Sequence, residues 1–430
     1  MDDKTWQRNS STVEEFSRDS KSSTRPHVAD PTDGRSLRVL TISTLFPNAA
    51  AESYGIFVAN RLRHLLATGE VEAQVIAPIP HLPLLGGLLR GEPSKAVVPL
   101  KTTWNGVPLH HPRFLAIPKL QMAAAPARLL SALGPLVRRI IEEGFRPEII
   151  DAHYFYPDGV AAARLGQLLG IPVVITARGT DLNVFPDFPV ARSQILEAAS
   201  SAAGLITVSE GLKQKLLQLG IAPHRVTVLR NGVDLHAFRH EGREASRQAL
   251  GIEGPVALMV GNLVELKGHA IALRALTHLP EVTLLIAGAG PLKASLSRLV
   301  KSLGMENRVR FLGRVPHGEL QNLYRAADQL LLCSSREGWP NVLLEAMACG
   351  TPVIATDIPG VREVVAAPQA GVLVKERTSK AFAQALEERL KQPPHPNDVR
   401  RYAEAFSWDS TTQGQLQIFR TILQGKGSPS

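Results

Sequence analysis

The sequence contains little cysteine and few aromatic residues. Two cysteines in 430 residues, with 5% aromatics, leave too few thiols for a disulfide framework or a cysteine-rich zinc site. No uncharged apolar run reaches about 18 residues, so the sequence predicts no transmembrane helix. The first residues, MDDKTWQRNSSTVEEF, lack a basic segment followed by an apolar one, which predicts no secretory leader. These absences favour a protein of the cytoplasm.

Ligand patterns for a catalytic metal are also missing. No two aspartates are separated by a single residue, and the sequence has no His-Glu-x-x-His motif and no cysteine cluster. Enzymes that hold a divalent cation or a zinc ion commonly show such spacings. We therefore expect no metal and no other cofactor, and any negative charge on a substrate has to be balanced by basic side chains and helix N-termini.

The chain carries a formal net charge of +9, and this charge is unevenly distributed. Residues 73–141 hold eight basic residues against the single acid Glu92. Trp104 and Phe114 are the aromatics of this stretch, too few for a nucleic-acid face that stacks bases. Two interpretations stay open: loops with solvated charges over a core, or a surface that meets anionic lipid. The basic residues are Arg90, Lys95, Lys101, Arg113, Lys119, Arg128, Arg138 and Arg139.

Short apolar runs alternate with amphipathic segments from residue 37 onward. Continuous Val/Ile/Leu runs are typical of strands buried on both faces, and the alternation predicts parallel βαβ units. Two successive sets of such runs predict an α/β protein with two Rossmann-like domains. The runs are 37–43, 71–77, 147–151, 172–176, 204–208 and 225–229, then 255–260, 282–288, 308–313, 329–333, 352–356 and 371–374.

The predicted domain boundaries follow changes in composition. Residues 1–36 are polar and carry no periodic apolar pattern, which predicts a disordered tail. The first domain spans 37–240 and the second spans 241–406, because the polar stretch His236–Gly254 separates the two sets of strands. Residues 407–430 contain one last helix, which we expect to cross back to the first domain. In such domains ligands bind at the carboxyl ends of the strands.

The densest group of candidate residues lies in CSSREGWPNVLLEAMACGTPVIATDIPG, residues 333–360. Glu337 precedes a glycine–proline turn, and a helix is predicted from about Asn341, which we expect to cap it. The free N–H groups of a first helical turn bind anions or sugar oxygens. Glu345 lies one turn into this helix among apolar neighbours, where a carboxylate needs a ligand or a fixed partner. Each glutamate could instead pair with a basic residue to join two elements.

This segment resembles the signature of family 4 glycosyltransferases, which are retaining enzymes with the two-domain GT-B fold. Two glutamates separated by seven residues within EGWPNVLLEAMACGTPVIATDIPG carry the resemblance, which extends over nearly the whole chain from residue 37. It implies that Glu337 contacts the donor sugar hydroxyls and that Glu345 contacts the nucleotide ribose. The backbone that would hold the sugar belongs to Gly338, Trp339, Pro340 and Asn341.

The segment VGNLVELKGH, residues 260–269, resembles the phosphate-binding loop of the same family. Lys267 stands at the matching lysine, where an ammonium group could neutralise a pyrophosphate; it could also be a solvated surface residue. Asn262 stands where the commonest family pattern has arginine, so the loop has one charge fewer. The segment GAGPLK, 288–293, resembles another family turn and fails as a dinucleotide fingerprint because it lacks a third glycine.

Three residues of the first domain are further candidates. Gly55 lies in FPNAAAESYGIFVANRL, which is similar to the acceptor-side loop that lies beneath the donor phosphates in the family. His153 follows a predicted strand at the position of a family histidine near the donor sugar. Arg178 follows the next predicted strand and could supply the charge that Asn262 does not. Each of these residues could instead be structural.

The resemblance implies transfer of a sugar from a nucleotide-diphosphate sugar to an acceptor hydroxyl with retention of configuration. The departing phosphate would help to deprotonate the acceptor in a front-face displacement. We expect a hexosyl- or N-acetylhexosaminyltransferase of cell-surface polysaccharide or glycolipid biosynthesis, with a lipid-linked or glycan acceptor. Its basic surface would touch the inner membrane face, and nucleic acid is not an expected partner. Two alternatives fit the same donor site: a nucleotide-sugar epimerase and a non-catalytic nucleotide-sugar-binding protein.

Overall fold

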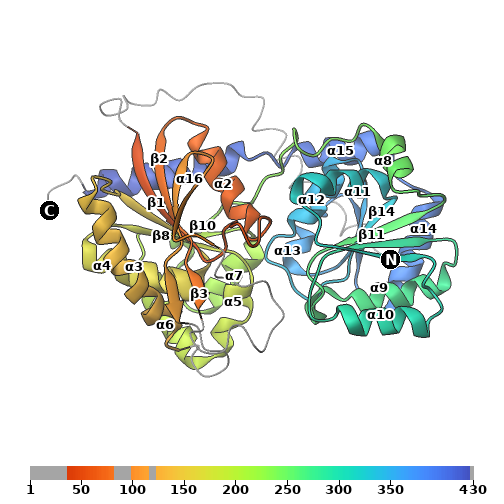
Figure 1. The fold of residues 1–430 in the computed structure, drawn as a ribbon, viewed down its shortest axis with the longest axis horizontal. Helices are drawn as coiled ribbons and strands as arrows, with labels where there is room; N and C mark the ends of the chain where they lie inside the picture. Colours follow the sequence, from red (N-terminus) through yellow and green to blue (C-terminus); the bar gives the residue numbers. More distant parts are fainter. Residues whose placement is uncertain (1–35, 82–97, 116–122, 427–430) are drawn as a thin grey trace. The chain divides into compact units, whose positions relative to one another are not determined.

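The chain forms two compact α/β units. The computed structural model describes residues 36–81, 98–115 and 123–426. The first unit joins Pro31–Asn231 to Trp408–Ser430, and the described part of the second unit is Gly232–Ser407. Each unit is a sheet covered by helices (Figure 1). The tail predicted to be disordered, residues 1–36, falls outside the described residues except for its last position.

The first unit is built on an eight-stranded sheet. Its order is β10-β9-β8-β7-β1-β2-β5-β4, so strand addition changes direction between β1 and β7. The strands are β1 (Leu37–Ile42), β2 (Val71–Ile76), β4 (Lys101–Trp104), β5 (Val107–His110), β7 (Ile149–His153), β8 (Val173–Ala177), β9 (Gly204–Thr207) and β10 (Val226–Val228). Two further strands, β3 (Ile79–His81) and β6 (Arg113–Leu115), pair with each other in parallel.

Helices cover both faces of this sheet. They are α2 (Ile56–Leu66), α3 (Ala125–Glu142), α4 (Val160–Leu169), α5 (Thr180–Asn183), α6 (Pro189–Ser201), α7 (Glu210–Gln218) and α16 (Asp409–Lys426). The C-terminal helix α16 shares one hydrophobic core with α2, to which Val58, Leu62, Leu416 and Phe419 contribute. Figure 1 shows α3, α4 and α6 on the side of the sheet away from α2. Residues from both ends of the sequence therefore build the first unit.

Residues 73–141 contain more secondary structure than expected if this basic stretch were a set of loops over a core. Loops over a core is the wrong description for the described part of this stretch, because it contains β3 to β6 and most of α3. Asn105 and Gly106 join β4 to β5 with φ values of 49° and 82°, the conformation that a two-residue hairpin turn requires. This pair is the antiparallel one in a sheet of parallel pairs. Arg90, Lys95 and Lys119 lie outside the described residues.

The second unit contains a six-stranded parallel sheet of order β13-β12-β11-β14-β15-β16. Here strand addition reverses between β11 and β14. Every run that the sequence predicted as a strand overlaps one, in both units; β7 and β8 extend beyond the ends of their predicted runs, so that His153 belongs to its strand. The strands are β11 (Val256–Val260), β12 (Thr283–Ala287), β13 (Val309–Gly313), β14 (Gln329–Leu332), β15 (Val353–Thr356) and β16 (Gly371–Val374).

The helices of the second unit lie mostly between these strands in the sequence. They are α8 (Arg243–Ala249), α9 (His269–Ala275), α10 (Lys293–Ser302), α11 (Leu320–Ala326), α12 (Asn341–Ala348), α13 (Pro359–Arg362), α14 (Ser379–Lys391) and α15 (Pro396–Glu404). The exceptions are α8, which precedes β11, and α14 and α15, which follow β16. The core under α9, α10 and α14 contains Leu273, Leu296 and Phe382. Buried strands such as β14, whose four residues are all inaccessible to solvent, explain why continuous apolar runs predicted this sheet well.

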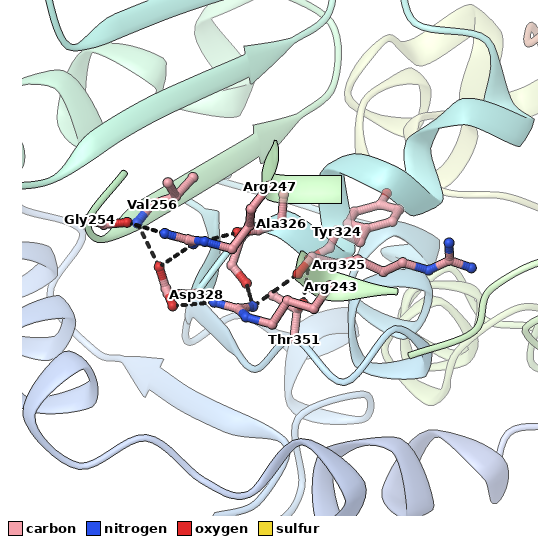
Figure 2. A network of polar contacts seen from close by, with 10 residues as sticks. Arg243, Arg247, Gly254, Val256, Tyr324, Arg325, Ala326, Asp328 and Thr351 are labelled. Carbon is pink, nitrogen blue, oxygen red and sulfur yellow. Dashed lines mark hydrogen bonds and ion pairs between the residues drawn. The ribbon is translucent and has the colours of Figure 1, made fainter. Parts of the chain in front are cut away.

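An ionic cluster ties α8 to the amino ends of β11 and β14 (Figure 2). Asp328, just before β14, accepts a hydrogen bond from the Val256 amide over 2.7 Å. The same carboxylate accepts from Arg243 over 2.5 Å and lies 3.5 Å from Arg247. Both arginines also donate to backbone carbonyls, Arg247 to Gly254 among them. This cluster therefore closes the edge of the sheet opposite to the strand ends where ligands bind in such folds.

Candidate active site

Two loops of the second unit meet at the carboxyl ends of β11 and β14. Lys267 ends a short 3-10 helix, Glu265–Lys267, after β11, and Glu337 lies in the loop after β14. The Nζ atom of Lys267 donates to Oε1 of Glu337 over 2.6 Å. Strand order reverses between these two strands, and ligands of open parallel sheets bind at such a reversal. The structure thus brings these two candidate residues together at the expected place.

Both side chains of this pair stay partly open to solvent, at 23% for Lys267 and 13% for Glu337. Across the described residues, Lys267 is the single polar partner of the Glu337 carboxylate. A carboxylate accepts about four hydrogen bonds and an ammonium group donates three. The pair therefore has unused capacity on both sides, for hydroxyl donors at Glu337 and for anionic oxygens at Lys267.

Glycine sets the distance between these two loops. Gly268 has φ of 65°, and a Cβ atom on it would lie 2.3 Å from the carbonyl oxygen of Cys333. The Ser335 amide donates to the carbonyl of Leu266 over 2.9 Å. The backbone after β11 is therefore packed directly on the backbone after β14, and this contact fixes the approach of Lys267 to its carboxylate partner.

The loop after β12 packs on the other side of the β11 loop. A Cβ atom on Gly288 would lie 1.8 Å from the carbonyl oxygen of Gly261, and one on Gly290 would lie 2.5 Å from that of Leu263. Side chains do not fit at either position. The glycines of GAGPLK therefore serve close backbone packing. Asn262, which stands where the family commonly has arginine, lies in this β11 loop with an exposed side chain.

The turn before α12 is largely buried. Gly338, Trp339 and Pro340 are buried and Asn341 is half-buried. A Cβ atom on Gly360, in α13, would lie 2.6 Å from the carbonyl oxygen of Gly338, so this turn is held against α13. The prediction that Asn341 caps the helix is wrong. The helix begins at Asn341 itself, and the cap position falls on Pro340, which has no side-chain acceptor.

Glu345 has fixed partners on the neighbouring helix α11 and the turn before it. The Tyr324 hydroxyl donates to Oε2 of Glu345 over 2.7 Å, and Nε2 of His317 lies 3.0 Å from Oε1. Burial, and then the Glu345 charge, raise the pKa of Tyr324 well above its ordinary value, so its hydroxyl remains a donor. These contacts explain how a carboxylate persists on an otherwise apolar helix.

In the first unit, His153 ends β7, beside the point where the strand order reverses. Its side chain is fully buried, with Nδ1 2.7 Å from a guanidinium nitrogen of Arg178 and Nε2 3.0 Å from Oδ2 of Asp151. Burial lowers the pKa of His153 to about 4 against the raising effect of Asp151. The imidazole is therefore neutral near pH 7, and both ring nitrogens face protein groups.

Arg178 follows β8 and is held on several sides. Its guanidinium also donates to Oδ1 of Asn231 over 3.0 Å, and its carbon lies 5.4 Å from the centre of the Phe57 ring. The Asp181 carboxylate accepts from the backbone amides of Phe155, Arg178 and Gly179. This side chain thus braces the start of α5, and the loop that presents Arg178 is rigid.

Gly55 occupies a position that no other residue would fit. Its φ is 66°, and a Cβ atom would lie 2.2 Å from the carbonyl carbon of Leu45. It immediately precedes α2, so the loop after β1 doubles back on itself before the helix begins. The glycine is needed for this close approach to the backbone of its own loop.

The candidate residues therefore form separate groups. Lys267 and Glu337 are in contact, His153 and Arg178 are in contact, and Glu345 has its own partners. The sequence interpretation missed Asp151, Tyr324 and His317. Asp151 had a signal, since it stands two positions before His153 on one strand and side chains two apart share a face. The others come from segments distant in sequence, for which no local pattern exists.

Two searches for other kinds of site found nothing among the residues that the structure describes. No group of three histidine, cysteine, aspartate or glutamate side chains is arranged to hold a metal ion there. In those same ranges, no helix has the length and apolar character needed to cross a membrane.

Comparison with known proteins agrees with this architecture. Residues 102–237 match the family described as Glycosyltransferase Family 4, and residues 242–406 match Glycosyl transferases group 1. Together the two ranges cover more than half of the chain. The Bacillus subtilis (strain 168) protein TuaC, which is assigned provisionally as a teichuronic acid biosynthesis glycosyltransferase, is 28% identical over 383 residues, which is 86% of this chain and 94% of that protein.

Solved structures share the fold. Sucrose-phosphate synthase from Thermosynechococcus elongatus has a TM-score of 0.74 at 18% identity, over 90% of this chain and 100% of that one. Anabaena HepE, in complex with UDP-glucose, has a TM-score of 0.66 at 21% identity, over 90% of this chain and 99% of that one. With two Rossmann-like parallel-sheet units, matches to both family descriptions and these neighbours, the chain belongs to the family 4 glycosyltransferases and has the GT-B fold.

Proposed function

We propose that this glycosyltransferase moves a hexosyl or N-acetylhexosaminyl group from a nucleotide-diphosphate sugar to an acceptor hydroxyl with retention of configuration. The observation that carries the proposal is the contact of Lys267 with Glu337 over 2.6 Å at the strand reversal of the second unit. We assign the donor to the second unit and the acceptor to the first.

The pair suits the charge changes of such a reaction. The leaving group is a nucleoside diphosphate, whose oxygens gain negative charge as the glycosidic bond breaks. An ammonium group already held in place stabilises that charge without reorganising. In the free protein Glu337 is the counter-ion of Lys267. When the donor is bound, phosphate oxygens take over the ammonium group, and the carboxylate accepts hydrogen bonds from sugar hydroxyls.

The remaining site residues complete the donor site in this proposal. The backbone of Gly338, Trp339, Pro340 and Asn341 faces the sugar, and Glu345 accepts from the ribose hydroxyls. Tyr324 and His317 hold Glu345 at the required place. Asn262 contacts the phosphates without a charge, and Gly55 allows the backbone of the first unit to approach them.

Retention follows from a front-face displacement, in which the departing phosphate accepts the acceptor proton. The chain offers no evident side-chain nucleophile for a covalent intermediate. His153 is neutral, and its Nδ1 accepts a hydrogen bond from Arg178, so it contributes by orienting Arg178, whose charge faces the donor. Closure of the site on the donor would exclude water and prevent its hydrolysis.

A role in cell-surface polysaccharide or glycolipid synthesis is supported by the Bacillus subtilis relative, whose name refers to teichuronic acid biosynthesis. The UDP-glucose complex of Anabaena HepE supports a nucleotide-sugar donor. The test is incubation of the purified protein with a panel of nucleotide sugars and either lipid extract or glycan acceptors. Sugar on the acceptor with retained configuration supports the proposal. Isomerised free donor, or binding without turnover, contradicts it.

A peripheral contact with the inner membrane face belongs to the same proposal. Among the basic residues of 73–141 that the structure describes, Lys101, Arg138 and Arg139 are exposed. Clustered basic side chains attract anionic lipid, and salt weakens that attraction. Co-sedimentation with anionic vesicles at low and high salt tests this. Binding that high salt abolishes supports the contact, and absence of binding at low salt refutes it.

A further inference from the structure

A chain of buried polar side chains crosses the first unit and connects its C-terminal helix to the strand reversal. No member is more than 8% exposed. It starts on α2, passes through α16 and β7, and ends at Asn231, the last residue of the segment Pro31–Asn231. Its members are Arg61, Gln415, Asp151, His153, Arg178 and Asn231.

Gln415 is the link contributed by α16. The Arg61 Nε atom donates to its Oε1 over 2.5 Å, and its Nε2 atom donates to Oδ2 of Asp151 over 2.8 Å. Arg61 also donates to the carbonyl of Leu229. Arginine has only donors and an ionised aspartate has only acceptors. The two neighbours therefore allow one orientation of the glutamine amide, and this orientation fixes the position of Asp151.

The next link determines the tautomer of His153. Arg178 offers only donors, so Nδ1 at 2.7 Å has to accept and carries no proton. The ring proton then lies on Nε2, which faces Oδ2 of Asp151 at 3.0 Å. A histidine in this state orients its neighbours and does not exchange protons with a substrate. Its free acceptor at Nδ1 is what holds the Arg178 guanidinium.

We propose that Gln415 is a positioning residue for sugar transfer: it holds Asp151 against His153, and His153, as the Nε2–H tautomer, holds Arg178 in its working orientation. The proposal rests on the proposed function, because only there does Arg178 face the donor. It makes the C-terminal helix part of the catalytic apparatus of the first unit, through a residue that lies 264 positions from Asp151 in the sequence.

The kinetic test uses Gln415→Leu, which keeps the approximate size and removes both polar contacts. We expect kcat/KM for the donor to fall about 10- to 100-fold, the usual cost of a misplaced reacting group. Gln413→Leu changes an exposed glutamine on the same helix and should behave like the parent enzyme. Equal activity of the two variants would overturn the proposal.

A double variant separates positioning from general stability. If Gln415 acts through Arg178, then Gln415→Leu should have little further effect on an enzyme that already carries Arg178→Lys, because residues in one network are not additive. Two effects that multiply independently would overturn the proposal. Should Gln415→Leu not fold, Gln415→Glu retains a partner for Arg61 but turns an acceptor towards Asp151, and the same comparison applies.

A spectroscopic readout does not depend on activity. Nitrogen NMR of ring-labelled histidines, with His153 identified by its loss in His153→Gln, should show an unprotonated Nδ1 and a protonated Nε2 from about pH 5 to 8. This pattern should be lost or become mixed in Gln415→Leu. An Nδ1–H tautomer in the parent, or an unchanged pattern in the variant, would overturn the proposal even if no donor is ever turned over. Absence of turnover with an intact pattern would count against the proposed function alone.

Discussion

The two units place their candidate residues at the same topological position but in opposite environments. In the second unit the strand reversal lies between β11 and β14, and Lys267 and Glu337 meet there with partly exposed side chains. In the first unit the reversal lies between β1 and β7, and Asp151 and His153 meet there with 1% or less of their side chains exposed. We call Lys267 and Glu337 the open pair, and Asp151 and His153 the sealed pair.

The difference shows what each pair can do. An open pair with unused hydrogen-bonding capacity can exchange its partner for a ligand at little cost, because water already competes for both groups. A sealed pair cannot, since breaking it would leave a buried charge without a partner. In the proposed reaction, the second unit therefore supplies groups that touch the donor. The first unit supplies groups that hold other groups in place.

We expect the largest loss of turnover when either residue of the open pair is replaced. Lys267→Ala and Glu337→Ala should each lower turnover about 1000-fold, because a preorganised charge at the reacting phosphate is lost. The free energy of unfolding should change by less than about 1 kcal/mol, since the pair is partly exposed. Sugar-transfer assays and urea unfolding measure the two quantities. Near-normal turnover in both variants would show that the open pair is not the donor site.

Low pH should destabilise the protein through the sealed pair. Unfolded His153 takes up a proton near pH 6.5, but burial moves the folded pKa to about 4. The free energy of unfolding that this residue contributes is complete above pH 6.5 and is lost as pH falls towards 4, by up to about 3 kcal/mol. Burial raises the pKa of Asp158 to about 7, which acts with the opposite sign across this range.

The histidine contribution is therefore measured as a difference. The pH dependence of the free energy of unfolding in His153→Gln should lack the loss of up to about 3 kcal/mol that His153 gives the parent between pH 6.5 and 4. In His224→Gln, which changes an exposed histidine of the same unit, it should stay as in the parent. Parallel curves for His153→Gln and the parent would mean that this imidazole is not sealed in solution.

The ionic cluster at the amino ends of β11 and β14 provides a purely structural reference (Figure 2). Asp328→Ala removes the acceptor of the Val256 amide and leaves Arg243 and Arg247 without their carboxylate. We expect a loss of about 2 kcal/mol in the free energy of unfolding.

Turnover per folded molecule in Asp328→Ala should remain within about twofold of the parent, because the cluster lies at the amino ends of the strands, away from the proposed donor site. Asp398→Ala, which breaks an exposed ion pair with Arg401, should change neither quantity. A large loss of turnover in folded Asp328→Ala would contradict the separation of the two sheet edges.

The smallest effect concerns Glu345. Tyr324→Phe removes one donor to its carboxylate and leaves His317 in place. The donor KM should rise about threefold to tenfold, which corresponds to about 1 kcal/mol, the net value of an ordinary hydrogen bond, with kcat almost unchanged. Tyr402→Phe removes a buried hydroxyl that bonds the Val364 carbonyl and is the matched control. Equal donor KM in the two variants would contradict the ribose contact.

The sheets could be predicted from the sequence because their strands are buried on both faces. Short strands such as β4 and β5 were missed, since neither KTTW nor VPLH is a continuous apolar run. Their Asn105-Gly106 turn was nevertheless a readable hairpin signal. The cap of α12 was misplaced because Asn341 has a side chain that is common at helix N-caps. The backbone enters the helix at Asn341 itself, so the cap position falls one residue earlier, on Pro340.

The site could be predicted only where it is local. Glu337, Glu345 and Lys267 lie in short segments whose glycine and proline residues shape the loops. Partners such as Tyr324 and Gln415 could not be found, because the contact depends on how distant elements pack. Polar side chains on amphipathic helices are common, and only the packed structure shows which of them point inwards.

The order of the segments along the chain has a consequence for synthesis on the ribosome. The second unit is contiguous, Gly232–Ser407, whereas the core of the first unit includes Leu416 and Phe419 from the last helix. The first unit is translated earlier but lacks those side chains until the end of translation. We expect a nascent chain stalled after Ser407 to protect the second unit from protease and to leave the first unit open to cleavage. The part of the enzyme that is made first would then be the last to mature.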